Sequence, residues 1–456
     1  METSHQVRIW SVERYKGKRK STYRVRWLVE KRRFGEQFAT SALADSFRSQ
    51  LVSAARTGEA FDIDTGLPVS MRREQKMPTM TWFEFACAYA DMKWPDSSPK
   101  YRKSLAESLS RITVAMLRDG VSVEDGKALR SALMQAFNKK RRDGDLSAKA
   151  SELLRVVRSG TREVSELANP EVLRAVLAEL DLNLDGKRAA ANTVRIRRTA
   201  LGDAVSFAIE KELLTANPLS QIKTKKRNYA LKEVDPKCVP NPIQARMLLA
   251  AVGKIGKQGP PLVAFFAVMY YAGLRPEEAC ALKKANLSIP ETGWGDLHLG
   301  RARPEIGEEW TDSGEASEEA PLKHRAENVE RPVPCPPVLT EILHNHLNRF
   351  GTAPDGRLFR GARDGGRVAS TVYGRVWATA RQLVFTEEVA AGPLAKRPYE
   401  LRHACVSTWL SGGVEATRVA KWAGHSLAVL LKVYAKCLDG GERTARDRAE
   451  KALRGW

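Results

Sequence analysis

Three stretches near the beginning of the chain alternate apolar and polar residues with the two-residue period of β-strands. They are VRIWSVERY, STYRVRWLV and RRFGEQFAT, within residues 7–40. A helical pattern, SALADSFRSQLVSAARTGEA, comes after them. We therefore predict a small module over residues 1–70, made of a three-stranded sheet and one helix.

From residue 79 to residue 219 the hydrophobic positions recur at helical spacing almost throughout. In the last of these segments, apolar residues stand at 194, 201, 205 and 209, and Asn217–Pro218 is expected to end the helix. DTGLPVSMRREQKMP reads as a linker before this region, and the basic stretch KTKKRNYALKEVDPK connects it to the C-terminal region. We predict a helical bundle over residues 79–222.

Residues 238–456 combine apolar helical runs with short strand candidates. PLVAFFAVMYYAG predicts a buried helix that ends at Gly273, and NLSIP, GDLHLGRA and ERPVPCP are the strand candidates. Between the last two lies EIGEEWTDSGEASEEA, with seven acids and no base, which we interpret as an exposed loop. The expected fold class is α+β multidomain, with a mainly helical third domain that carries a small antiparallel sheet.

The net charge and the cysteines indicate which kinds of binding partner and metal site to expect. The net charge is +21 and the pI is near 9.8, so a nucleic-acid backbone is the simplest counter-ion. The six cysteines form no CxxC pair, so they indicate neither a disulfide scaffold nor a zinc site. No secretory signal and no apolar run of membrane-spanning length is seen. We therefore expect a soluble, cytoplasmic protein that is associated with the nucleoid and has no membrane contact.

Polar residues able to act on a phosphodiester recur within residues 399–434. Arg402 lies in one helical run, and the next run ends at Gly424, which places His425 on the turn beyond. Tyr434 comes nine residues later, in a third short helix. The arginine fork matches phosphate oxygens, an imidazole can donate a hydrogen bond, and a phenol can attack phosphorus. The segment therefore favours chemistry on a nucleic-acid strand.

A second arginine, Arg275, stands before Pro276 at another predicted helix start. GLRPEE, LRHACVSTWL, AGHS and VYAKCL, in this order, resemble the tyrosine recombinase (phage integrase) family over about the last two hundred residues. The resemblance implies a three-domain integrase with an N-terminal domain that binds arm sites.

Residue by residue, the resemblance makes Arg275 and Arg402 the two catalytic arginines, His425 the histidine and Tyr434 the nucleophile. Glu278 matches the acid that comes after the first arginine. Lys323 fits the lysine that the family carries on a β-hairpin, although here the long acidic stretch separates it from the preceding strand candidate. Lys283 and Lys284 are the alternatives for that lysine.

One position departs from the family pattern: Tyr399 occupies the usual His or Lys position, three residues before Arg402. A phenol, with a reference pKa of about 10, is a poor proton acceptor at neutral pH. Tyr399 could contact the phosphate or compete with Tyr434 as nucleophile, but Tyr434 holds the family spacing after AGHS. His403 could replace the imidazole, yet adjacent helical residues face different ways, which favours a structural role. The general base stays open.

Basic and aromatic residues of the first two domains are the candidate DNA contacts. The resemblance implies that the sheet module enters a major groove at arm sites and that the bundle clamps the core site. An interdomain docking surface or a solvated face is the alternative. The candidates are Arg24, Arg26, Arg32 and Arg33 in the module, and Tyr101, Arg102, Lys103, Arg195, Arg197 and Arg198 in the bundle.

The function implied is that of a site-specific recombinase, which cleaves and rejoins DNA through a 3′-phosphotyrosyl intermediate to integrate or excise a mobile element, without metal or cofactor. Expected partners are double-stranded DNA with core and arm attachment sites, further copies in a homo-tetramer on DNA, and a DNA-bending or directionality factor. The tail would dock on a neighbouring copy through Leu453 and Trp456, unless it frays. Two other classes remain open: a non-catalytic DNA-binding regulator and a type IB topoisomerase-like enzyme.

Overall fold

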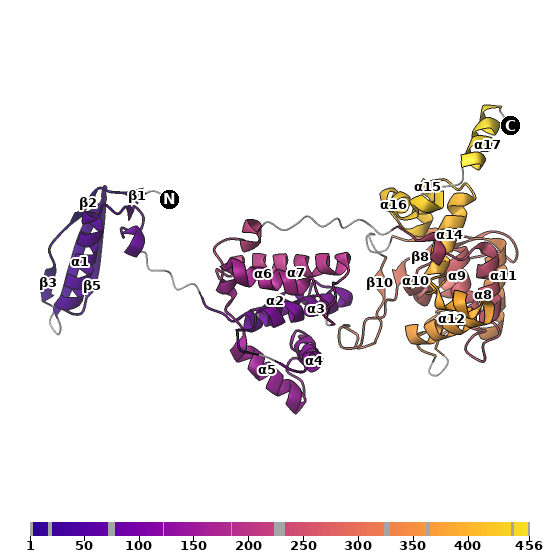
Figure 1. The fold of residues 1–456 in the computed structure, drawn as a ribbon, viewed down its shortest axis with the longest axis horizontal. Helices are drawn as coiled ribbons and strands as arrows, with labels where there is room; N and C mark the ends of the chain where they lie inside the picture. The colour runs from indigo at the N-terminus through magenta and orange to yellow at the C-terminus, as the bar shows by residue number, and fades with distance from the viewer. Residues whose placement is uncertain are drawn as a thin grey trace. The chain divides into compact units, whose positions relative to one another are not determined.

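The computed structural model of the protein describes residues 3–16, 21–71, 78–121, 123–183, 185–222, 233–322, 329–361, 365–438 and 442–454 (Figure 1). The chain divides into two compact units. The first comprises Met1–Phe85, Thr161–Leu173 and Asp203–Ile222, and the second Ala86–Gly160, Arg174–Gly202 and Lys223–Trp456. The expected domain boundaries at 1–70, 79–222 and 238–456 stay a prediction.

The N-terminal module is an antiparallel sheet covered on one face by a helix. Strand β4 (Ser21–Val29) is central; β5 (Arg32–Phe38) pairs with one edge, and β2 (Val7–Ile9) and β3 (Glu13–Lys16) share the other. The short strands β1 (Thr3–Ser4) and β6 (Phe61–Asp62) pair with each other. Helix α1 (Ser41–Arg56) packs on the β4 face that carries the buried residues Val25, Trp27 and Val29.

The first predicted strand is broken in two. Ile9 is opposite Trp27, whereas Glu13 is opposite Arg24, so three residues of one strand face two of the other. Such an extra residue is a β-bulge, which bends the strand and ends regular pairing. The sheet is therefore three strands wide, as expected. It is made of four strands, because β2 and β3 lie along the same edge of β4.

The region from residue 78 to residue 222 is helical, as predicted. Its α-helices are α2 (Trp82–Lys93), α3 (Pro99–Ala115), α4 (Gly126–Ala136), α5 (Ala148–Gly160), α6 (Pro170–Leu180) and α7 (Ala191–Glu210). Val194, Leu201 and Val205 of α7 are buried. This helix ends earlier than expected, because Glu212 takes a left-handed conformation (φ 57°) before Asn217–Pro218 is reached.

The C-terminal region is organised around α9 (Leu262–Tyr271), whose side chains are almost all buried. Its core is completed by α8 (Pro242–Val252), α10 (Pro276–Ala281), α11 (Pro337–Phe350), α12 (Ser370–Val384) and α14 (Glu400–Ser411); α13 (Glu387–Ala391) comes after α12. Strands β7 (Leu287–Ser288), β8 (Gly295–Leu299) and β11 (Arg331–Cys335) form an antiparallel sheet in the order β11–β8–β7. All three strand candidates and the α+β class are confirmed.

A separate hydrophobic cluster lies between α14 and the two short helices that come after it. After α14 come α15 (Ala416–Ala423) and α16 (Leu427–Leu438), and Val406, Leu430 and Tyr434 are buried among them.

Helix α17 (Glu442–Leu453) is the last, with Leu453 89% exposed. Trp456 lies outside the described residues, so docking of the tail stays a prediction. In the described ranges, no helix is both long enough and apolar enough to span a bilayer.

The acidic stretch over residues 305–320 is a loop, as predicted, but it is only partly exposed. It lies between β9 (Arg301–Ala302) and β10 (Ala320–Pro321), which pair with each other. Trp310 and Thr311 are buried within it. Its carboxylates form ion pairs, among them Asp312 with Arg102, Glu315 with Arg303 and Glu319 with Lys283. The acidic composition therefore reflects pairing with basic neighbours.

Candidate active site

Arg275 is held at the turn between α9 and α10. Gly273, with φ +63°, lets the chain reverse there, and Arg275 is the N-cap residue of α10. Its backbone N–H donates to Glu278 Oε2 (2.9 Å) and its Nη1 to Glu278 Oε1 (2.7 Å). Nη2 donates to the Gly424 carbonyl (3.1 Å). The predicted helix start thus positions the first arginine and brings it to the far segment that carries His425.

Glu278 is a buried carboxylate surrounded by three guanidiniums. Arg331 Nη2 lies 2.7 Å and Arg402 Nη1 3.9 Å from Oε2, in addition to the Arg275 contact. Burial by itself raises the pKa of Glu278, but Arg331, Arg402 and Arg275 lower it to about 2. Glu278 is therefore ionised at neutral pH. Among the described residues, three guanidiniums against this one carboxylate leave the cluster with two positive charges in excess.

Arg402 is fully buried, in the first turn of α14. Its Nη1 donates to the Gly273 carbonyl and its Nη2 to the Ala423 carbonyl. Nη2 also lies 3.0 Å from His425 Nε2. Its Nε has no hydrogen-bond partner in the part of the chain that the structure describes. One guanidinium thus ties the α9–α10 turn to the end of α15, and the two predicted catalytic arginines share Glu278.

His425 stands on the turn after Gly424, as predicted from the helix stop. Burial, together with Arg402 and Arg275, lowers the pKa of His425 to about 3, so the ring is neutral at pH 7. Because Arg402 donates to Nε2, the hydrogen of the neutral ring is on Nδ1. Nδ1 is buried and has no partner among the described residues. The imidazole therefore has an N–H available for an anion.

Arg331, on β11, belongs to the cluster but was not predicted. Its Nη1 donates to the Ala423 carbonyl (3.2 Å), and its side chain is 1% exposed. The only sequence signal was the two-residue period of the strand, which puts Arg331 on the same face as Val333 and Cys335. Both of these are buried. A charged residue in phase with a buried face needs a charged partner, and Glu278 is that partner.

Tyr434 is fully buried, and its hydroxyl lies 2.8 Å from His403 Nδ1. It sits where α16 leaves helical geometry (φ −109°, ψ 15°). The ring centroids of Tyr434 and His425 are 6.1 Å apart, so a single imidazole separates the phenol from Arg402. The structure thus brings Arg275, Arg402, His425 and Tyr434 together. It also adds His403, which sequence reasoning took to be structural.

The remaining predicted catalytic residues are Tyr399 and Lys323. Tyr399 begins α14, and its ring packs edge-on against that of His403, with centroids 5.0 Å apart. Lys323 lies outside the described residues, so its role stays a prediction. The alternative Lys283 is ion-paired with Glu319 (2.9 Å), and Lys284 is exposed.

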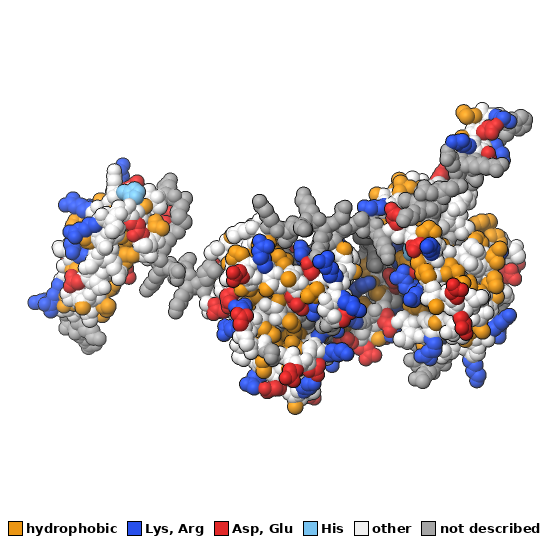
Figure 2. All heavy atoms as spheres, viewed as in Figure 1, with side chains coloured by type: hydrophobic (Ala, Val, Ile, Leu, Met, Phe, Trp, Pro, Cys, Tyr) orange, Lys and Arg blue, Asp and Glu red, His pale blue; other side chains and the backbone are white. Residues whose placement is uncertain are grey.

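In the N-terminal module, the open face of the sheet carries arginines. Arg24 and Arg26 alternate with the buried residues of β4, and Arg33 is opposite Leu28, so these three share the face that α1 does not cover. Figure 2 shows Lys and Arg side chains along one edge of this module. Arg32 is opposite Val29, on the other face, and pairs with Asp64 (2.7 Å). The strand period thus separates Arg32 from the other three candidates.

Several bundle candidates are occupied by contacts within the chain. Arg102 is buried, stacks on Trp94 and forms two hydrogen bonds with Asp312 (2.8 and 3.0 Å). Lys103 donates to the Ile306 carbonyl, Arg197 to the Leu180 and Leu182 carbonyls, and Arg198 pairs with Asp181. Tyr101 and Arg195 are exposed. We therefore keep Tyr101 and Arg195 as candidate DNA contacts and set Arg102 aside, because its guanidinium is buried and bound to other parts of the chain.

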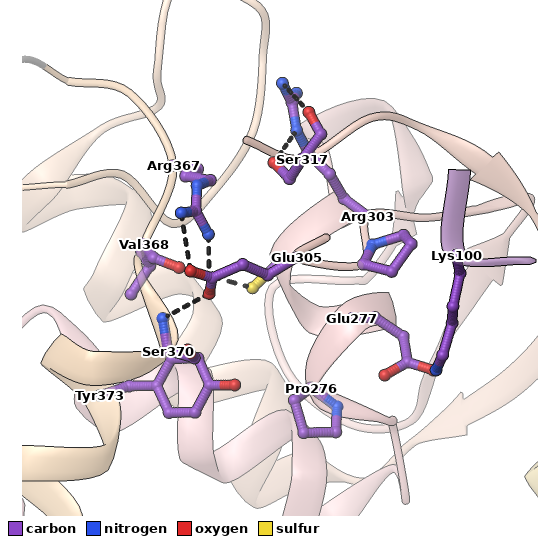
Figure 3. Close-up of a pocket in the computed structure, with 12 residues that line it drawn as sticks. Lys100, Pro276, Glu277, Arg303, Glu305, Ser317, Arg367, Val368, Ser370 and Tyr373 are labelled. Atoms are coloured by element: carbon purple, nitrogen blue, oxygen red, sulfur yellow. Dashed lines mark hydrogen bonds and ion pairs between the residues drawn. The ribbon is translucent and has the colours of Figure 1, made fainter. Parts of the chain in front are cut away.

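A cavity of about 280 Å³ lies beside the start of α10 (Figure 3). In it, Glu305 points toward Arg367, and each Glu305 oxygen lies 2.8 Å from an Arg367 nitrogen. The hydrogen bond from Arg367 is the main reason that the pKa of Glu305 falls to about 2. The backbone N–H of Ser370 also donates to Glu305. The charge of Glu305 is thus balanced by Arg367 within this cavity, whereas the arginines around Glu278 leave an excess of positive charge.

No protein-family model and no curated protein matches the sequence. Solved structures do match. The Tn1549 transposon integrase in complex with transposon right end DNA is 15% identical (TM-score 0.48; 81% of this chain, 100% of that chain). XerH site-specific recombinase bound to difH substrate is 14% identical (TM-score 0.39; 74% and 93%). A lambda integrase tetramer bound to a Holliday junction is 13% identical (TM-score 0.40; 89% and 89%).

The chain is similar to tyrosine recombinases of known structure. All three TM-scores are below 0.5, so we base the function on the site itself.

Proposed function

We propose that this chain cleaves and rejoins DNA strands as a tyrosine site-specific recombinase, with Tyr434 as the nucleophile. The observation that carries the proposal is the buried cluster of Arg275, Arg331 and Arg402 around Glu278, one imidazole away from the phenol. It joins an excess of positive charge to a group that can attack phosphorus.

The charge excess favours a phosphodiester as the missing anion. Burying charge without compensation is costly, and a phosphate would balance one of the two excess charges. Arg402 Nε and His425 Nδ1, which have no partner within the described ranges, are donors that an anion would satisfy. Such donors stabilise the charge that builds on the non-bridging oxygens in the transition state.

Tyr434 and Lys323 are the groups to which we assign the steps of strand cleavage. The Tyr434 oxygen attacks phosphorus, and the bond to the 5′ oxygen breaks with its electron pair leaving on that oxygen. Lys323 is the proposed acid that protonates it. The products are a 3′-phosphotyrosyl ester and a 5′-hydroxyl, and attack by the hydroxyl of a partner strand reverses the step. The phosphoryl bond is conserved in the ester, so no external energy source is needed.

Recognition is assigned to the open face of the N-terminal sheet. Arg24, Arg26 and Arg33 present guanidiniums on one surface, and a sheet face of this kind fits a major groove. We propose that it reads arm sites, while Tyr101 and Arg195 help to hold the core site. A homo-tetramer on DNA, a DNA-bending or directionality factor, a role in moving a mobile element and a cytoplasmic, nucleoid-associated location belong to the same proposal.

A nicked suicide duplex tests the proposal, with DNA taken from both sides of the gene as substrate. The protein should form a covalent adduct that survives denaturing electrophoresis; Tyr434→Phe should bind the same DNA but form none. Tyr399→Phe is the matched control and should keep the adduct. An adduct that persists in Tyr434→Phe would move the nucleophile elsewhere.

The same assay separates the competing classes. A DNA-binding regulator would bind without forming an adduct. A type IB topoisomerase-like enzyme would form one on any sequence and relax a supercoiled plasmid. The proposed recombinase forms an adduct only on its own site. The convergence of Arg275, Arg402, His425 and Tyr434 disfavours the regulator, which has no use for a buried nucleophile.

A further inference from the structure

The hydrogen bond between His403 and Tyr434 joins residues of two different helices. Tyr434 comes from α16 and His403 from α14, and the Tyr434 hydroxyl lies 2.8 Å from Nδ1 of the imidazole. Adjacent α14 residues point apart: Arg402 reaches the Gly273 and Ala423 carbonyls, while His403 reaches α16. The predicted nucleophile thus has a nitrogen base in contact with its reacting oxygen.

We propose that His403 is the proton acceptor for the Tyr434 hydroxyl in strand cleavage. This assignment rests on the recombinase function proposed above and supplies the base that the sequence left open. Tyr399, in the position where the family carries His or Lys, contacts His403 through its ring edge instead. The imidazole missing from position 399 is supplied from position 403, one helical turn further along the same helix.

The surroundings set the ionisation of His403. Burial, with Arg402 and Arg397, lowers its pKa to about 4, so the ring is neutral at pH 7 and Nδ1 can accept a proton. The other ring nitrogen, Nε2, lies 3.9 Å from Oε2 of the buried Glu400. Arg397 Nη2 holds the Glu400 carboxylate at 2.8 Å. The rings of Tyr399 and Tyr434 also contact His403.

The proton and the electron pairs balance in this step. As the Tyr434 oxygen bonds to phosphorus, the bond to the 5′ oxygen breaks with its electron pair on that oxygen, the Tyr434 proton passes to His403 Nδ1, and the ring becomes an imidazolium. Glu400 faces the Nε2–H of that cation and stabilises it, as a carboxylate behind a catalytic histidine does. The bound phosphodiester, which is anionic, also favours the cation. In rejoining, the 5′-hydroxyl attacks phosphorus and returns its proton to Lys323, while the departing phenolate recovers its proton from His403.

His403→Asn is the decisive variant. The Asn carbonyl can still accept a hydrogen bond from the phenol near the position of Nδ1, but it is not basic. Adduct formation on a nicked duplex that the wild-type protein cleaves should fall about 100-fold or more in His403→Asn and in His403→Ala. Substitution of the half-buried His344, which contacts the Pro290 carbonyl, by Asn is the control and should leave the rate unchanged. Thermal melting and DNA binding of each variant show whether it is folded.

Two further readouts separate a base from a structural residue. Between pH 5 and 9 the variant rates should rise with pH, because hydroxide replaces the imidazole, whereas the wild-type rate should be nearly flat above pH 5. A substrate with sulfur at the bridging 5′ position needs no acid for its leaving group, so it should not relieve the defect. Relief by sulfur would make His403 the acid instead.

Failure of the proposed function and failure of the base assignment would give different results. Wild-type protein that forms no adduct on any DNA would overturn the proposed function itself. An adduct lost in Tyr434→Phe but formed at the wild-type rate in His403→Asn would overturn only the base assignment. A rate that increases in His403→Asn would show that the hydrogen bond restrains the nucleophile, and would also reject the proposal.

Discussion

Gly424 lies against the guanidinium of Arg331 so closely that a β-carbon at position 424 would fall 2.0 Å from Nη1. Gly424 is also the left-handed C-cap of α15 (φ 63°, ψ 48°), the conformation that turns the chain toward His425. One glycine therefore allows both the close approach of the arginine and the placement of the imidazole.

Gly424→Ala should destabilise the protein and impair cleavage. The left-handed conformation costs a β-carbon about 1 kcal/mol, and the collision with Arg331 adds about 1–3 kcal/mol. Urea unfolding measures the total. Gly356→Ala is the control: Gly356 has φ +83° but no neighbour within 4 Å of the added carbon, so it should show only the backbone cost. Equal costs for the two variants would contradict the predicted collision.

Glu278→Gln should lower the free energy of unfolding by about 3–5 kcal/mol, because it leaves three buried guanidiniums without their carboxylate. The neighbouring Glu277→Gln should cost less than about 1 kcal/mol, since that side chain is half-buried at the cavity beside α10. Chemical denaturation of both variants checks the difference. A Glu278→Gln protein as stable as the wild type would show that the cluster is not held by this charge.

Stability should fall on acidification below pH 6.5. The pKa values of His403 and His425 are lowered to about 4 and about 3, and burial lowers that of His346 as well. In the unfolded chain the histidine pKa is near 6.5. Below that pH the unfolded chain therefore binds more protons than the folded chain. Each such histidine lowers the unfolding free energy by up to about 1.4 kcal/mol per pH unit between its two pKa values.

Urea midpoints measured from pH 4.5 to 7.5 test this dependence. Replacing His403 by Asn should make the slope shallower, whereas Tyr434→Phe, which keeps every imidazole, should retain it. An unchanged slope in His403→Asn would mean that this ring is not buried in its neutral form.

DNA binding by the N-terminal module should depend on which face an arginine occupies. In the Tyr434→Phe background, Arg24→Ala and Arg33→Ala should each weaken binding and reduce the slope of log K against log salt by about one. Arg32→Ala is the matched control: it is adjacent to Arg33 in the chain but lies on the opposite face, paired with Asp64. Fluorescence anisotropy over a salt series measures the slopes. Equal losses for all three would contradict a single binding face.

Much of the architecture could be predicted from local pattern. Gly273 and Gly424 end helices where expected, Pro276 begins one, and both predicted catalytic arginines come after turns at helix starts. These features depend on neighbouring residues, which a sequence displays directly. The helical positions 194, 201 and 205 are buried for the same reason.

What could not be predicted depends on residues distant in the chain. His403 was assigned a structural role from its neighbours on α14, but its partner comes from α16, 31 positions later. Arg331 was not predicted and Arg102 was predicted to contact DNA, because their carboxylate partners, Glu278 and Asp312, are distant in the chain. The acidic stretch was expected to be exposed throughout for the same reason. Composition alone cannot tell a solvated charge from one that a distant arginine neutralises.

The proposed nucleophile Tyr434 and the Arg402–His425 pair belong to one polypeptide and already meet within it. A mixture of Tyr434→Phe and Arg402→Ala subunits should therefore stay inert, since neither can lend the other what it lacks. In an assembly of intact and disabled copies, the number of strands cut should simply equal the number of intact ones.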